Sequence, residues 1–82
     1  MRAGLAYRLL VRRGSATPAL LASPDRLDHV EIVDVSSGEV VLFWDCNPRE
    51  ASRLARALRT DLAGREAEDF IARWSRSAGA RT

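Results

Sequence analysis

The chain has 82 residues, a formal net charge of +2 and one cysteine. This length suits a single small domain, and one cysteine excludes an internal disulfide framework and suits a reducing compartment. The sequence contains no run of about 18 apolar residues and no apolar secretory core, so we expect a cytoplasmic protein with no membrane partner.

The charges are unevenly distributed along the chain. All thirteen basic residues are arginine, a bias typical of high-GC bacterial genomes. Five arginines and one aspartate give residues 1–27 a net charge of +4, five acids give residues 28–46 a charge of −5, and eight arginines with five acids give residues 49–82 a charge of +3. Blocks of opposite sign within one small domain are expected to pair with each other rather than to attract a polyanion.

The N-terminal part predicts two strands. Apolar and polar residues alternate from Ala6 to Arg13, which indicates a half-buried strand with Tyr7, Leu9 and Val11 on one face. After turn-forming residues, a proline can open a second short strand over residues 18–22, although leucine and alanine are mediocre strand formers.

Residues 28–46 predict a β-hairpin. The sequence Ser-Ser-Gly in its middle is typical of a three-residue loop closed by a left-handed glycine. A loop of this kind sets the register of the two strands, so that His29 lies opposite Asp45 and Val33 opposite Val41.

The most apolar run of the chain, residues 40–47, forms the second arm of this hairpin and predicts a strand covered on both faces. Pleating separates the apolar side chains of the two arms into two sets. One face carries Val30, Ile32, Val40, Leu42 and Trp44. The other face carries Val33, Val35, Val41 and Phe43.

A long helix is predicted directly after the hairpin. Asn47 is a good N-cap, Pro48 suits the first helical position, and Glu50 follows three residues after the cap. Gly64 is expected to stop the helix. The apolar residues recur at helical spacing and form one stripe: Ala51, Leu54, Ala55, Leu58 and Leu62.

A second, short helix is predicted from Glu66 to about Trp74, with acidic residues in its first turn and an apolar edge made by Phe70, Ile71 and Trp74. The fold class is therefore predicted to be α+β: a four-stranded antiparallel β-meander, one long amphipathic helix on the face that carries Val30 and Ile32, and a short C-terminal helix. Residues 1–75 would form the domain, and residues 76–82 a flexible tail.

Four residues near one end of the hairpin have metal-ligand chemistry: Asp28, His29, Asp45 and Cys46. The predicted register places Asp28 and Cys46 on one face and His29 and Asp45 on the other, so the four cannot converge. We therefore expect no metal and no cofactor, and a solvated cross-strand pair between His29 and Asp45.

Cys46 precedes the N-cap of the long helix, and a helix N-terminus can lower the pKa of a thiol. A nucleophile also needs a base, and the one histidine projects from the other face of the hairpin. We therefore expect Cys46 to be a small apolar residue that seals the strand–helix junction. Without a phosphate loop or a paired acid and base in the sequence, we expect the chain not to be an enzyme.

The expected function is that of a non-catalytic protein-interaction module, either a homodimer or an accessory subunit of a bacterial assembly. One long helix covers about one face of a small sheet, which leaves the face with Val33, Val35, Val41 and Phe43 for self-association. A two-fold dimer could also set the acidic hairpin of one subunit against arginines of the other.

The alternative function is nucleic-acid binding through the exposed face of the long helix, where Arg49, Arg53, Arg56 and Arg59 could contact phosphates. Two observations weigh against it. The sequence places no aromatic residue among these arginines. In addition, Glu50 and Asp61 lie one turn from arginines and are expected to neutralise part of the face.

Overall fold

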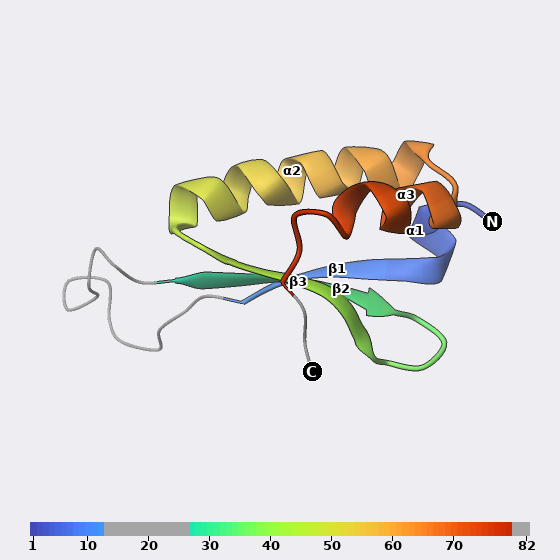
Figure 1. Cartoon of the computed structure of the whole chain (residues 1–82), viewed down its shortest axis with the longest axis horizontal. Helices are drawn as coiled ribbons and strands as arrows, with labels where there is room; N and C mark the ends of the chain where they lie inside the picture. The colour runs from blue at the N-terminus through green and yellow to red at the C-terminus, as the bar shows by residue number, and fades with distance from the viewer. Residues whose placement is uncertain (13–26, 80–82) are drawn as a thin grey trace.

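The computed structural model describes residues 1–12 and 27–79. In chain order the elements are α1 (Ala3–Ala6), β1 (Tyr7–Arg12), β2 (Asp28–Asp34), β3 (Val40–Cys46), α2 (Pro48–Gly64) and α3 (Ala67–Trp74). The strands form one antiparallel sheet in the order β1-β2-β3, and the helices form a second layer over one face of it (Figure 1). Among the described residues, no helix has the length and apolar character needed to cross a membrane.

The prediction of a four-stranded sheet is wrong, because the described sheet has three strands. β1 pairs directly with β2, with Leu9 opposite Ile32 and Val11 opposite Val30. In a meander that follows the chain order, the predicted strand at residues 18–22 would pair with this edge of β2. Residues 18–22 lie outside the described residues. The alternating pattern of β1 fits the half-buried place beside β2 better than the leucine- and alanine-rich stretch does.

The predicted hairpin register is confirmed from the Asp28–Cys46 pair to the Ile32–Leu42 pair. Beyond that point the prediction is wrong, because a bulge shifts the register and Val33 lies opposite Val40 instead of Val41. The glycine of the loop, Gly38, has the expected positive φ of 76°.

The core lies between the sheet and the helices, on the predicted face. Val30, Ile32, Leu42 and Trp44 are each at most 9% exposed, and Ala51 and Leu58 of α2 are buried in the same cluster. The predicted cap of α2 is also confirmed, since the Glu50 N–H donates to Asn47 Oδ1 at 2.8 Å. This bond satisfies one of the free amides of the first helical turn.

The prediction that residues 40–47 form a strand covered on both faces is wrong. β3 is an edge strand of the sheet, and burial alternates along it. Leu42, Trp44 and Cys46 are buried beneath the helices, whereas Val41 and Asp45 are exposed. An antiparallel sheet with helices on one side gives this alternation.

The segment after α3 returns to the outer edge of β3. Trp44 Nε1 donates to Ser77 Oγ at 3.1 Å, and the Gly79 N–H donates to the Phe43 carbonyl at 2.8 Å. A Cβ on Gly79 would lie 2.8 Å from Phe43 Cζ, so any other residue there would force the Phe43 ring to shift. The single domain over residues 1–75 and the flexibility of residues 76–82 stay predictions.

Candidate functional site

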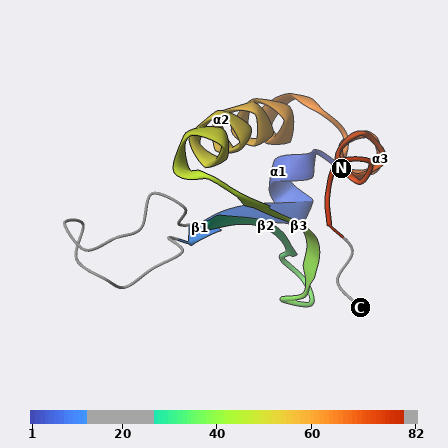
Figure 2. The same ribbon diagram turned by 60° about the vertical axis from the view of Figure 1, so that its left-hand side comes forward.

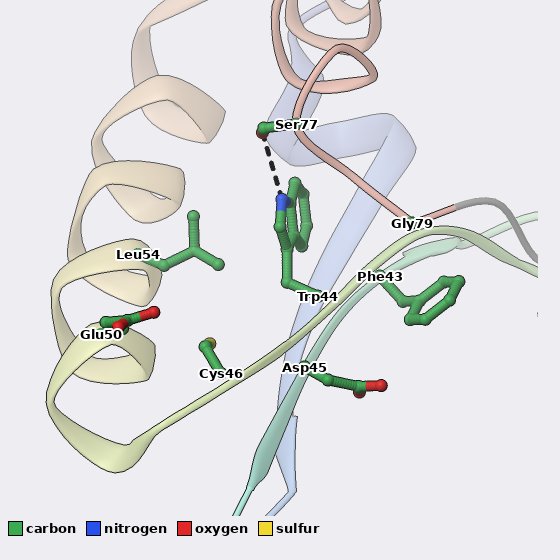
Figure 3. A pocket seen from close by; sticks show the side chains of 8 residues that line it. All are labelled: Phe43, Trp44, Asp45, Cys46, Glu50, Leu54, Ser77 and Gly79. Carbon is green, nitrogen blue, oxygen red and sulfur yellow. Dashed lines mark hydrogen bonds between the residues drawn. The ribbon is translucent and has the colours of Figure 1, made fainter.

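The outer edge of β3 borders a hollow of about 500 Å³, lined by Phe43, Trp44, Asp45, Cys46, Glu50, Leu54, Ser77 and Gly79. Figure 3 shows that Trp44 and Cys46 point toward α2, whereas Phe43 and Asp45 point to the other side of the strand. The hollow therefore extends around the strand edge. Its two carboxylates, on Asp45 and Glu50, lie on different sides of β3 and do not face a common point (Figure 3).

The residues with metal-ligand chemistry are placed as the register predicted. Asp28 and Cys46 form one cross-strand pair, and His29 and Asp45 form the next. The predicted pair between His29 and Asp45 is confirmed, with 2.5 Å between Nδ1 and Oδ1 and both side chains partly exposed. In residues 1–12 and 27–79, no three such side chains are close enough to hold a metal ion together.

Cys46 is 9% exposed and lies beside the first turn of α2. Burial raises the pKa of its thiol, and the carboxylates of Glu50, Asp28 and Asp45 raise it further. The local surroundings therefore outweigh the helix N-terminus, which would lower the pKa. A reactive thiolate at this position is not supported.

We expect Cys46 to react with iodoacetamide near pH 8 more slowly than free cysteine does, because the thiolate is the attacking species and the folded chain disfavours it. The rate can be followed by mass spectrometry. The same chain in concentrated guanidinium chloride is the control and should react at the rate of free cysteine. A folded-state rate equal to or above that of free cysteine would contradict this expectation.

The sheet face opposite the helices is the second feature of interest. The predicted residues Val33, Val41 and Phe43 lie on it, and Val41 is 40% exposed. Val35 lies in the turn just beyond β2 and is exposed. The structure adds Leu10, which is 36% exposed and lies in the same cross-strand row as Glu31 and Phe43. We call this surface the open face.

Charged groups flank the apolar part of the open face. Arg12 of β1, His29 of β2 and Asp45 of β3 occupy the row next to Leu10. Arg12 also contacts Glu31, with 3.1 Å between Nε and Oε1, and the Glu31 side chain is 3% exposed. The open face thus carries a cation on one edge strand and an anion on the other.

The third feature is the exposed side of α2. The four arginines singled out in the sequence are all exposed there: Arg49, Arg53, Arg56 and Arg59. Within residues 1–12 and 27–79, none of the four has an ion-pair partner. The predicted neutralisation by Glu50 and Asp61 is therefore wrong. Glu50 accepts a hydrogen bond from Asn47 instead, and Asp61 pairs with other arginines.

Arg53 and Arg56 border a groove of about 380 Å³ between α2 and α3, whose other lining residues are Ala57, Thr60, Asp61, Arg73 and Trp74. The sequence placed no aromatic residue near these arginines, because Trp74 belongs to the next helix. The packing of α3 on α2 brings this tryptophan to the groove. A helical projection of α2 alone could not reveal it.

Comparisons of the chain with protein-family models, with curated proteins and with solved structures found no match. The function has to be inferred from the hollow, the open face and the arginine-lined groove themselves.

Proposed function

We propose that the chain is a non-catalytic protein-interaction module that forms a homodimer through the open face of its sheet. The observation that supports this most directly is the pattern on that face: exposed apolar side chains flanked by Arg12 on β1 and Asp45 on β3, in the same cross-strand row. This pattern is complementary to itself.

The complementarity follows from two-fold symmetry. Consider two sheets that face each other, related by an axis parallel to the strands. β1 of each subunit then lies over β3 of the partner, and rows stay aligned. Arg12 faces Asp45 of the partner subunit, and this contact occurs twice. In the next row, Leu10 faces Phe43 of the partner subunit. Glu31, in the middle of this row, faces Glu31 of the partner subunit across the axis, and Arg12 of its own chain balances its charge at 3.1 Å.

The position of the helices supports the same interface. A single layer of helices covers the sheet, with α3 beside α2 and on the same side of the sheet (Figure 2). Neither helix is therefore available to bury Leu10 or Val41, and apolar side chains left exposed on one face of a sheet are typical of an interaction surface.

Size-exclusion chromatography with light scattering tests the proposal. At tens of micromolar, the wild-type chain should have twice the mass of the 9.1 kDa monomer. Leu10→Asp should weaken the dimer at least roughly 100-fold, because it would bury an unpaired carboxylate against Phe43 of the partner subunit, which costs about 3 kcal/mol or more. Leu10 is exposed in the single chain, so the variant should stay folded by circular dichroism.

Ser52→Asp is the matched control, since it adds the same charge at an exposed position on α2 and should leave the dimer unchanged. If Leu10→Asp does not fold, Val41→Arg tests the same face from the opposite edge strand, because it sets a second cation opposite Arg8 of the partner subunit. A wild-type mass of one chain at these concentrations overturns the homodimer.

A further inference from the structure

The exposed side of α2 carries positive charges that form no ion pair with the described residues. Arg53 and Arg56 lie about one helical turn apart, and Arg49 and Arg59 extend the row to a length of about 15 Å. Since none of the four has an ion-pair partner among the described residues, their charge is available to an anion in solvent.

The other wall of the groove holds a fixed pair of planar groups. Trp74 Nε1 donates to Asp61 Oδ2 at 2.9 Å, and Arg73 Nε lies 3.0 Å from the same oxygen. The Arg73 guanidinium also lies over the Trp74 ring, 5.7 Å from its centroid. One carboxylate therefore fixes a guanidinium over an aromatic ring at the groove.

We propose that this groove binds single-stranded nucleic acid, an activity beyond the proposed homodimer and carried by different residues. Arg53 and Arg56 contact successive phosphates, and an unpaired base stacks on the exposed guanidinium of Arg73, which lies over the half-buried Trp74 ring. A basic row beside a stacking surface is the combination that single-strand-binding proteins use. The arginines alone would be enough to bind phosphates. The planar pair adds recognition of an exposed base, which a duplex keeps within its own stack.

Fluorescence anisotropy with a labelled oligo(dT) tests this proposal. Three to four arginine–phosphate contacts predict a slope of roughly −2 to −3 for the logarithm of affinity against the logarithm of salt concentration, or about a 20- to 50-fold loss between 50 and 200 mM salt. Arg53→Ala/Arg56→Ala should reduce the slope by about 1.4 and weaken binding roughly 25-fold at 0.1 M salt.

Arg2→Ala/Arg8→Ala is the control, because it removes the same charge from exposed positions on α1's N-cap and on β1, outside the groove. It should change the affinity less than threefold. Leu10→Asp should bind with the wild-type affinity per chain, because the open face and the groove lie in different layers. A monomeric chain would therefore not contradict nucleic-acid binding at the groove. Absence of nucleic-acid binding would likewise not contradict the homodimer.

Trp44→Phe leaves Trp74 as the one tryptophan of the chain. Its fluorescence should be quenched when oligo(dT) binds, because a base stacks beside the ring. Three results would overturn the proposal: no binding at low salt, tighter binding of a duplex of the same length, or binding of heparin and oligo(dT) alike without quenching. The last result would assign the groove to a general polyanion or to a phosphorylated protein.

Discussion

Phe70→Ala is expected to lower the free energy of unfolding by about 3–5 kcal/mol, the usual cost of removing a fully buried phenylalanine. Phe70 is fully buried and is the residue through which α3 enters the core. Its ring stacks on Tyr7 of β1 at a centroid distance of 6.0 Å and lies 6.5 Å from Trp74. The substitution therefore loosens the contact between the C-terminal helix and the N-terminal strand.

This loss is large for a chain of this size. A domain of 82 residues has a total stability of about 4–12 kcal/mol, so the substitution removes at least about a quarter of it. Urea unfolding followed by circular dichroism measures the effect. Ile71→Ala, at a half-buried position of the same helix, is the control and should cost about 1–2 kcal/mol. A loss below about 1.5 kcal/mol for Phe70→Ala would mean that α3 is not part of the core.

The elements that the sequence predicted correctly are those with local signals. Asn47 and Pro48 identify the start of α2 because an N-cap and a helical proline act within one turn. The Ser-Ser-Gly sequence identified the turn of the hairpin, although the loop closes at the Asp34–Glu39 hydrogen bond and is one residue longer than predicted. The bulge offsets that residue, so the predicted pairing of His29 with Asp45 holds. Both signals depend on residues that are close in the chain.

The errors concern pairings between distant parts of the chain. β1 lies beside β2 although fifteen residues separate them, and no local pattern distinguishes this pairing from a meander through residues 18–22. The short helix α1 was missed because four residues carry too little periodicity to be recognised. The bulge at Val33 likewise depends on how the strand twists beneath the helices, which the alternation pattern does not record.

The candidate site was predictable to the same extent. The exposure of the α2 arginines follows from the helical period, and the open face follows from strand alternation. The groove has two walls from different helices, so its tryptophan and the partners of Asp61 could be known only after α3 was placed against α2. The raised pKa of Cys46 could likewise be known only from the packing, since burial of the thiol is its main cause.

Asp61→Asn is expected to change stability and binding in opposite directions. Asp61 is the negative charge of the groove, and its Oδ2 lies 3.1 Å from Arg65 Nε and 3.0 Å from Arg73 Nε. Asparagine can still accept the hydrogen bond from Trp74 but loses the charge of both ion pairs. Because both arginines are partly exposed, the loss of unfolding free energy should be about 1–2 kcal/mol, below that of a fully buried pair.

The same substitution should tighten the binding of oligo(dT), because it removes a repulsive carboxylate and releases Arg73 for a phosphate. One additional contact corresponds to roughly a fivefold gain in affinity at 0.1 M salt and a slope steeper by about 0.7. Glu68→Gln removes one negative charge from an exposed position of α3 outside the groove, and it should leave both quantities nearly unchanged. If stability and affinity both fall in Asp61→Asn, the carboxylate acts mainly by positioning Trp74 and Arg73. The groove then binds through that fixed pair rather than through its net charge.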